Sequence, residues 1–261
     1  MIHSVLLIGQ SNAGGRGFPS EVEPIPNDDG SIVVLRNGRW RKMYTPVNPD
    51  RVTSGVSLAE SFAAAYRDDH PDVDKIGIIP CADGGSRLAQ WEPGLLLYDH
   101  AVAMARLAQR TSNIVAVLWH QGEGDCYPER YPLYERNFRT ILHALRRDLG
   151  LEDVPVLVGG LGQFLAEFQP ANGGENVFRN YIHINDALKR VEKEEPLVSY
   201  VPATGLTSNA DRMHFNASSL REFGLRYYRA FRGLEDRFRV WPEKPTMADL
   251  EGSPNRLLED L

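Results

Sequence analysis

The feature that most constrains the fold of this chain is a set of continuously apolar runs of strand length. Five such runs occur, at 4–9, 75–80, 114–119, 154–159 and 197–201. They are apolar at successive positions rather than at alternate ones, which is typical of strands buried on both faces of a parallel sheet. The sequence therefore predicts a sheet that other elements cover on both sides.

Segments with helical periodicity separate these runs. Ser57 and Glu60 form a possible capping box for a helix over 58–66. Further helices are predicted at 96–109, 131–149, 177–194 and 218–234. Because strands that alternate with helices imply right-handed crossovers, we predict one three-layer α/β/α sandwich at 1–235 with a mainly parallel five-stranded sheet. Residues 236–261, rich in proline and charge, are expected to form a C-terminal surface tail.

Composition narrows the classes of protein that remain. The chain has 261 residues, 42% hydrophobic and 25% charged, which suits a globular domain that needs no disulfide or structural metal. Its net charge of -6 and lack of a Lys/Arg run argue against nucleic acid and anionic membranes as partners. Cys81 and Cys126 are the only cysteines, and the N-terminus lacks the pattern of a signal peptide. We expect a cytoplasmic protein, although a chain trimmed of a leader would look the same.

A serine on a glycine-bounded turn follows the first apolar run. Ligands of such sheets bind beyond the carboxyl ends of the strands, so residues at these positions are candidates for a site. The turn over 9–15 exposes the Ser11 hydroxyl and offers backbone N–H groups to an oxyanion. Alternatively, Ser11 caps a helix in a glycine-rich loop. Ala13 breaks the Gly-x-Ser-x-Gly pattern, which disfavours the common α/β-hydrolase class.

The second and third runs are also followed by candidate site residues. Gly84 and Gly85 allow close approach of the backbone to a ligand, and one of their N–H groups could be an oxyanion donor. After the third run, Gln121 has an amide that could donate to the same oxyanion, and Glu123 could orient a histidine. The alternatives are a plain turn at the first place and a solvated acidic loop at the second.

An acid and a histidine lie between the fifth run and the last helix. Asp211 precedes His214 by three residues, so its carboxylate can bend back to Nδ1–H and leave Nε2 free to take a proton from a serine. Alternatively, Asp211 is a loop or capping residue and His214 a structural one. Taken together, the four clusters supply a nucleophile, a base, an orienting acid and oxyanion donors.

These clusters resemble the conserved blocks of the SGNH hydrolases, and within them the sialate O-acetylesterase and acetylxylan esterase branch, carbohydrate esterase family six. The similar residues are Gly9-Gln10-Ser11-Asn12, Gly84-Gly85 with Trp91, His120-Gln121-Gly122-Glu123 and Asp211-Arg212-Met213-His214. The resemblance spans about 4–232, nearly the whole chain. It implies a flavodoxin-like SGNH fold.

The resemblance also implies roles for residues of this chain. Ser11 would be the nucleophile and His214 the base, while Asp211 or Glu123 would be the acid. The oxyanion hole would comprise the Ser11 N–H, the N–H of Gly84 or Gly85, and the Gln121 side chain, which stands where the wider superfamily usually has Asn. Asn12, Trp91 and Tyr127 are candidate substrate-binding residues.

The implied activity is that of a serine esterase, which removes acetyl groups from a carbohydrate through an acyl-enzyme. Its partner would be a small-molecule or oligosaccharide acetyl ester, and it would need no cofactor. One alternative is a metal-assisted hydrolase that uses His120, Glu123 and Asp125. Another is a non-catalytic carbohydrate-binding module.

Overall fold

The computed structural model of the protein describes residues 1–234, 237 and 243–251. Its centre is a seven-stranded sheet in the order β3-β2-β4-β1-β5-β6-β7. The strands are β1 (Ile2–Gly9), β2 (Ile32–Arg36), β3 (Arg39–Lys42), β4 (Lys75–Pro80), β5 (Ser112–His120), β6 (Val156–Gly159) and β7 (Val198–Val201). All neighbouring pairs are parallel except β2 and β3.

The expected number of five strands is wrong, because a hairpin adds two strands at the β4 edge. The five predicted strands do form the order β4-β1-β5-β6-β7, which is that of a doubly wound flavodoxin-like sheet. The additional hairpin turns at Asn37 and Gly38, whose φ angles are 48° and 75°. Two positive φ angles in a two-residue loop are typical of a type I′ turn, and Asn-Gly is its preferred sequence. The outer strand β3 is mostly charged, which protects an edge from pairing with other chains.

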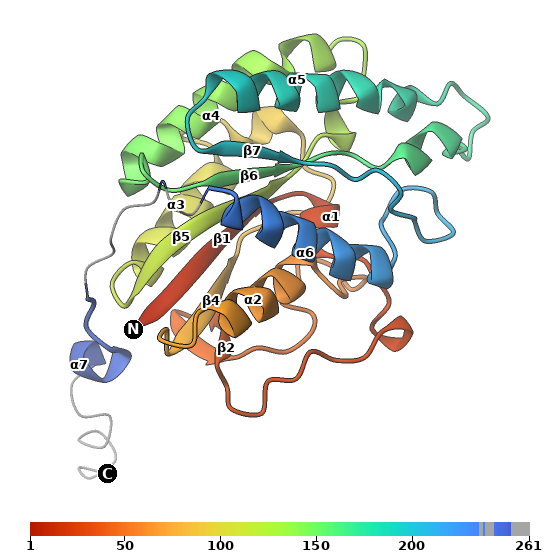
Figure 1. The fold of residues 1–261 in the computed structure, drawn as a ribbon. Coiled ribbons are helices and arrows are strands. Elements are labelled where there is room, and N and C mark those ends of the chain that lie inside the picture. The colour runs from red at the N-terminus through yellow and green to blue at the C-terminus, as the bar shows by residue number, and fades with distance from the viewer. Residues whose placement is uncertain (235–236, 238–242, 252–261) are drawn as a thin grey trace.

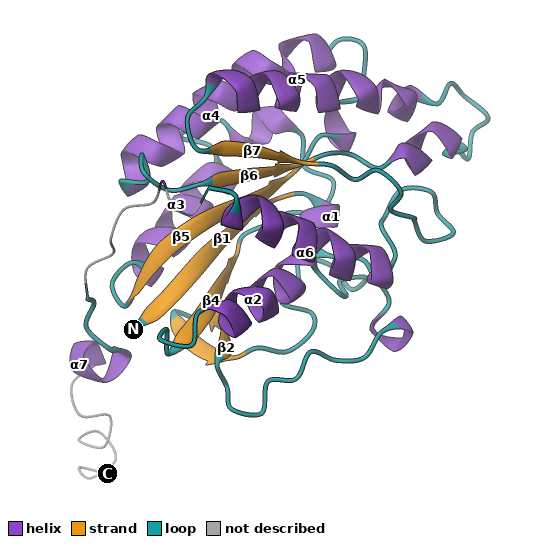
Figure 2. Cartoon of the chain, in the orientation of Figure 1, coloured by secondary structure: helices purple, strands orange, loops and turns teal. Residues whose placement is uncertain are grey.

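Helices cover both faces of the sheet (Figures 1 and 2). They are α1 (Ser11–Gly14), α2 (Leu58–Asp69), α3 (Leu96–Ala108), α4 (Tyr134–Leu149), α5 (Tyr181–Glu194), α6 (Ala217–Arg232) and α7 (Met247–Glu251). Helices α2 and α6 pack together on one face, whereas α3 and α4 lie on the other and α5 packs on α4 and β7. The predicted three-layer arrangement is therefore correct.

Short 3-10 turns extend several of the loops and helices. They comprise Pro19–Glu21, Leu88–Trp91, Glu123–Asp125, Tyr131–Leu133, Gln163–Glu167 and Val177–Asn180. The helices predicted to begin at 131 and 177 begin with such turns, and their α-helical parts start at Tyr134 and Tyr181. The capping box predicted for α2 is confirmed, since Ser57 Oγ accepts from Ala59 N–H and Glu60 accepts from Ser57 N–H.

The point where the chain changes direction across the sheet lies between β1 and β5. The chain leaves β1 for β4 on one side and later returns to β5 on the other, so the loops after β1 and β5 open a crevice at their carboxyl ends. Gly9 lets these loops touch, because a Cβ there would lie 2.0 Å from the His120 carbonyl oxygen. The fold thereby places Ser11 beside the residues that follow β5.

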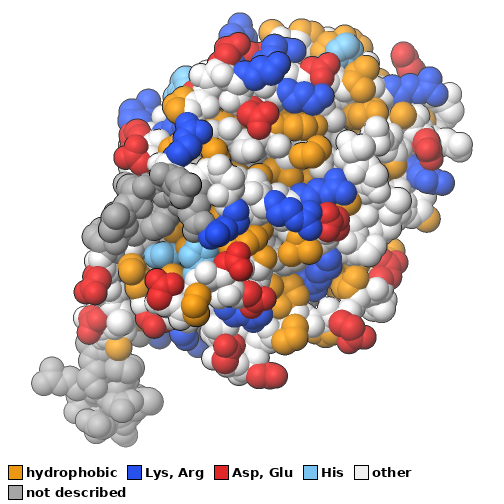
Figure 3. Space-filling view, viewed as in Figure 1, with side chains coloured by type: hydrophobic (Ala, Val, Ile, Leu, Met, Phe, Trp, Pro, Cys, Tyr) orange, Lys and Arg blue, Asp and Glu red, His pale blue; other side chains and the backbone are white. Residues whose placement is uncertain are grey.

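Acidic and basic side chains are interspersed over the face that Figure 3 shows, without a large field of one sign. None of the helices in the described ranges is long and apolar enough to cross a membrane. Most of the expected C-terminal tail, 236, 238–242 and 252–261, lies outside the described residues. Within the remainder, Met247–Glu251 form the short helix α7.

Candidate active site

Three of the predicted residues form one hydrogen-bonded chain. Ser11 is the first residue of α1, and its Oγ lies 3.0 Å from His214 Nε2. His214 Nδ1 in turn lies 2.7 Å from Asp211 Oδ2. The other carboxylate oxygen, Oδ1, accepts from the backbone N–H groups of Met213 and His214 at 2.9 and 3.0 Å. Asp211 is thus held in a local turn that aims it at the imidazole.

The charge of Asp211 suits this position. Partial burial acts to raise its pKa, but the hydrogen bonds from His214 and Met213 outweigh it and hold the pKa below the ordinary value. Asp211 is therefore ionised at neutral pH. A carboxylate at Nδ1 fixes the tautomer in which Nε2 can accept a proton from Ser11, and it stabilises the imidazolium that results.

Ser11 and Gly85 line the same pocket, and neither backbone N–H group has a hydrogen-bond partner in the described part of the chain. Ser11 begins a helix, so its N–H has no acceptor in a preceding turn. Gly85 has a φ of 79°. The N–H of Gly84 is already used, because it donates to Asp50 Oδ2 at 2.8 Å. The sequence left open whether Gly84 or Gly85 donates to the oxyanion, and the geometry favours the N–H of Gly85.

The structure corrects the expected place of Gln121. Its side chain is fully buried and does not line the pocket at Ser11. The amide donates to Asp125 Oδ2 at 2.6 Å and to the Ser86 carbonyl at 3.1 Å, and it approaches Gln10 Oε1 at 3.3 Å. Both N–H bonds of the amide are thus occupied, so Gln121 braces the loop after β5 instead of facing an oxyanion.

Glu123 does not contact His214. Its Oε1 accepts from Asn12 Nδ2 at 2.5 Å and lies 3.2 Å from His120 Nε2. Of the two carboxylates that could orient the base, the geometry therefore favours Asp211. The substrate-binding role expected for Asn12 is wrong, because that side chain is only 1% exposed and all its hydrogen bonds are internal.

The pocket above Ser11 has a volume of about 450 Å³. Tyr127 lines it, as expected of a substrate-binding residue, and the Arg130 guanidinium lies 4.2 Å from the centre of the Tyr127 ring. The same role for Trp91 is wrong, because Trp91 is buried against Trp119 and offers no ring face to a ligand. Its indole N–H instead donates to Ser86 Oγ at 3.0 Å and braces the loop that carries Gly85.

The sequence did not single out several residues of this pocket. These are Gln10, Arg16, Arg51, Arg87, Arg130, Phe178 and Met213. Gln10 accepts from the N–H groups of Gly122 and Gly124 and so joins the loops after β1 and β5. A signal existed only for Gln10, Arg87 and Met213, which lie within or beside the recognised blocks. The others come from segments without a recognisable pattern.

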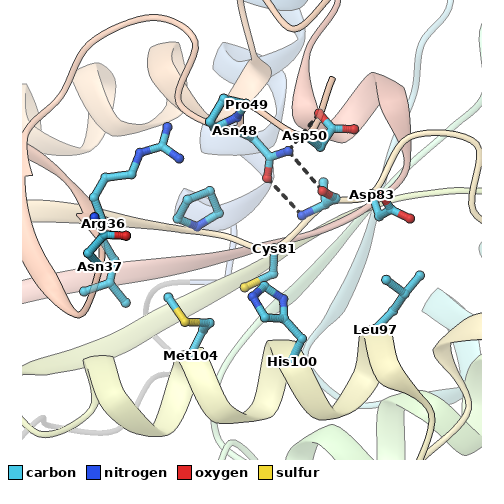
Figure 4. Close-up of a pocket in the computed structure, with 13 residues that line it drawn as sticks. Arg36, Asn37, Asn48, Pro49, Asp50, Cys81, Asp83, Leu97, His100 and Met104 are labelled. Carbon is cyan, nitrogen blue, oxygen red and sulfur yellow. Dashed lines mark hydrogen bonds between the residues drawn. The ribbon is translucent and has the colours of Figure 1, made fainter. Parts of the chain in front are cut away.

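A buried ion pair supports the wall of the pocket. Arg16 donates to both oxygens of Asp50, at 3.1 and 2.7 Å, and Asp50 also receives the Gly84 N–H. Beside it lies a second pocket of about 350 Å³ (Figure 4). There Asn48 binds the Ala82 backbone through both groups of its amide, each at 3.0 Å. None of the predicted site residues lines this second pocket, and the Asn48 bonds at its edge hold the loop after β4.

The three residues considered as metal ligands do not converge. His120 and Glu123 contact each other, but Asp125 turns away and accepts from Leu88 N–H and the Gln121 amide. Within the described ranges, no group of three or more His, Cys, Asp or Glu side chains is arranged to hold a metal ion.

Comparison with known proteins identifies the family. The family model described as carbohydrate esterase, sialic acid-specific acetylesterase matches residues 2–233. A relative from Arabidopsis thaliana, named a probable carbohydrate esterase, is 29% identical over 251 residues, which cover 87% of this chain and 88% of the relative.

Solved structures show the same fold. A structure of an Arabidopsis thaliana protein superposes with a TM-score of 0.75 at 26% identity, covering 89% of this chain and 98% of that one. A structure of NanS gives a TM-score of 0.70 at 18% identity, covering 90% and 98%. Because the family model spans nearly all of the α/β domain, this chain belongs to the carbohydrate esterase family of sialic acid-specific acetylesterases.

Proposed function

We propose that this protein is a serine carboxylic ester hydrolase that removes acetyl groups from a carbohydrate by an acyl-enzyme mechanism. The observation that carries the proposal is the chain of hydrogen bonds from Ser11 through His214 to Asp211. Ser11 and His214 line a pocket together with Gly85, and the N–H groups of Ser11 and Gly85 have no hydrogen-bond partner among the described residues. Family membership independently supports acetyl ester hydrolysis.

The proposed reaction has two steps. Ser11 Oγ attacks the acetyl carbonyl carbon while His214 Nε2 takes the hydroxyl proton, and the resulting oxyanion accepts from the N–H groups of Ser11 and Gly85. The tetrahedral intermediate collapses to acetyl-Ser11 as His214 returns the proton to the departing sugar oxygen. Water, deprotonated by His214, then attacks the acetyl group and releases acetate and free Ser11.

The charges of the pocket favour a sugar that carries a carboxylate. Four guanidinium groups line it, those of Arg16, Arg51, Arg87 and Arg130. Three are paired, with Asp50, Asp83 and Glu129 respectively, whereas Arg87 has no ion pair among the described residues. Arg87 is exposed and so is available to an anionic ligand.

Two measurements test the proposal. Treatment with a fluorophosphonate should modify Ser11, as mass spectrometry of the peptides would show, and Ser11→Ala should abolish both labelling and hydrolysis of 4-nitrophenyl acetate while unfolding at the same temperature. A variant that still hydrolyses the ester at near wild-type rate would exclude the serine mechanism. An unreactive wild-type protein would favour a carbohydrate-binding module.

The substrate proposal has its own test. An O-acetylated sialic acid should be hydrolysed with a lower KM than its neutral methyl ester. Arg87→Gln should raise KM for the anionic ester about fivefold, as the loss of one exposed ion pair of about 1 kcal/mol would give, and leave the neutral ester unaffected. Equal KM values for the two esters in the wild-type protein would contradict an anionic substrate.

A further inference from the structure

Asn12 links the two loops that bring Ser11 and His214 together. Its Oδ1 accepts from the Phe215 N–H at 3.0 Å, and its Nδ2 donates to the Met213 carbonyl at 3.1 Å. Met213 and Phe215 are the chain neighbours of His214. The Asn12 side chain, next to Ser11, therefore fixes the backbone on both sides of His214.

Glu123 determines which way the Asn12 amide points. The carboxylate only accepts hydrogen bonds, and Asn12 Nδ2 donates to its Oε1 at 2.5 Å. A flipped amide would place its oxygen against the carboxylate and its NH₂ group against the Phe215 N–H. With Glu123 in place, the orientation that holds the 213–215 segment is therefore the only favourable one.

Glu123 is a buried carboxylate that is held by few partners. Its side chain is 1% exposed, and a buried carboxylate costs free energy that apolar packing would avoid. Burial acts to raise the pKa of Glu123, but attraction to His120 and hydrogen bonds from His120 and Asn12 outweigh it and lower the pKa. The Oε2 atom of Glu123 and Nδ1 of His120 have no hydrogen-bond partner. Among the described residues, Asn12 is thus the one partner outside the pair whose hydrogen bond to either of the two side chains is seen.

We propose that Glu123 is a positioning residue that fixes the Asn12 amide, and that Asn12 in turn holds His214 in register with Ser11. This inference rests on the serine mechanism proposed above and assigns Glu123 a role other than that of the acid at His214 Nδ1. Neither Asn12 nor Glu123 takes part in proton transfer. They instead set the distance and angle between Ser11 Oγ and His214 Nε2, between which the proton moves.

The first test removes the link. Asn12→Ala should lower kcat about 100-fold with KM unchanged, because a displacement of about 1 Å at reacting groups costs a factor of that size. Asn27→Ala is the matched control: Asn27 is also buried and binds one residue, Ile32, through its backbone N–H and carbonyl at 2.9 and 2.8 Å. It lies before β2, away from Ser11, so its loss should lower the unfolding temperature without lowering kcat.

The second test exchanges donor and acceptor. Asn12→Asp sets two carboxylates against each other and should lower kcat at least as much as Asn12→Ala. Glu123→Gln keeps an acceptor oxygen and should cost less than tenfold. Adding it to Asn12→Asp restores a donor opposite an acceptor at residue 123, while the bond to the Met213 carbonyl stays lost. The double variant should therefore recover part of the lost kcat, at least tenfold over Asn12→Asp.

Two results would overturn the inference. One is a kcat of Asn12→Ala within threefold of wild type, and the other is a double variant no faster than Asn12→Asp alone. If Ser11→Ala is inactive in the same assay, either result contradicts the positioning role and leaves the serine mechanism standing. An active Ser11→Ala variant would instead mean that the proposed function itself had failed.

Discussion

Gln121 is a residue whose position in the sequence fits an oxyanion donor, whereas the structure gives it the role of bracing a loop. Its place after a core strand and its amide group both match an oxyanion donor. The structure shows that the amide is held by Asp125 and the Ser86 carbonyl, below the surface of the pocket. Burial raises the pKa of Asp125, so this carboxylate depends on the few donors around it.

Gln121→Ala should therefore reduce stability rather than act on kcat alone. Leaving the buried Asp125 with one donor fewer should cost about 1–3 kcal/mol and lower the unfolding temperature by several degrees. An oxyanion donor would instead lower kcat by two to three orders of magnitude at unchanged stability. Calorimetry and steady-state kinetics on the same preparation separate the two outcomes, and the second would restore Gln121 to the oxyanion hole.

The acid that orients His214 can be identified by near-isosteric substitutions. Asp211→Asn keeps the shape but lets the imidazole adopt the wrong tautomer, so kcat should fall by about four orders of magnitude, as in serine proteases. Glu123→Gln should lose less than tenfold, since Glu123 has no contact with His214. The reverse order of the two kcat values would make Glu123 the acid.

At the scale of elements, the contact between the end of α1 and the segment just before α2 depends on Gly15. Its φ is 95°, and a Cβ there would lie 2.2 Å from the Val56 carbonyl oxygen, two residues before α2 begins. Gly94 has a similar φ of 87° but open space around it. Both glycines therefore have a positive φ that L-residues rarely adopt, and they differ in whether a Cβ would clash.

Substituting each glycine by alanine separates strain from contact. Gly94→Ala should cost about 1–2 kcal/mol, the penalty of a left-handed backbone for an L-residue. Gly15→Ala should cost about 1–3 kcal/mol more, because the α2 start must move away from Ser11. Chemical denaturation measures both. Equal free energies of unfolding would show that the loops of the site adapt without strain.

The sequence predicted well those elements whose hydrophobic pattern lies within their own residues. Buried parallel strands are apolar throughout, so β1, β4 and β5 were recognisable without knowledge of their neighbours. The hairpin of β2 and β3 was missed although Asn37-Gly38 is a strong turn signal, because the segment that follows the turn, Arg39–Lys42, is not apolar. Its strands are short, and β3 is charged at the edge of the sheet.

On the scale of the whole molecule, the site residues that were missed are those joined by contacts between distant segments. Ser11, Gly85 and His214 each follow a strand or precede a helix, so topology alone brought them to one edge. Asn12 carries no pattern that would distinguish a link to Met213 and Phe215 from a contact with substrate. Such partners are set by packing in three dimensions, which a single sequence does not encode as a local pattern.

The Arg16–Asp50 pair provides a last prediction, because it ties three distant segments of the molecule together. Both side chains are nearly buried, and Asp50 also accepts from Gly84 N–H, Ser54 Oγ and the Asn48 amide. Burial acts to raise the pKa of Asp50, but the bonds and charge of Arg16 outweigh it and lower the pKa. The stability that the pair contributes is therefore fully present above the unfolded-state value of about 3.9 and is lost as pH falls through the lower folded value.

Asp50→Asn removes this charge while keeping the shape of the side chain. At pH 7 it should cost about 3–5 kcal/mol, because the buried Arg16 guanidinium is left unpaired. Below pH 4 the wild-type protein should lose stability as Asp50 takes up a proton, whereas the variant has no such group at this position. The difference in unfolding free energy between the two should therefore narrow from pH 5 to pH 2. Parallel stability curves over this range would show that Asp50 is not the group whose ionisation holds the three segments together.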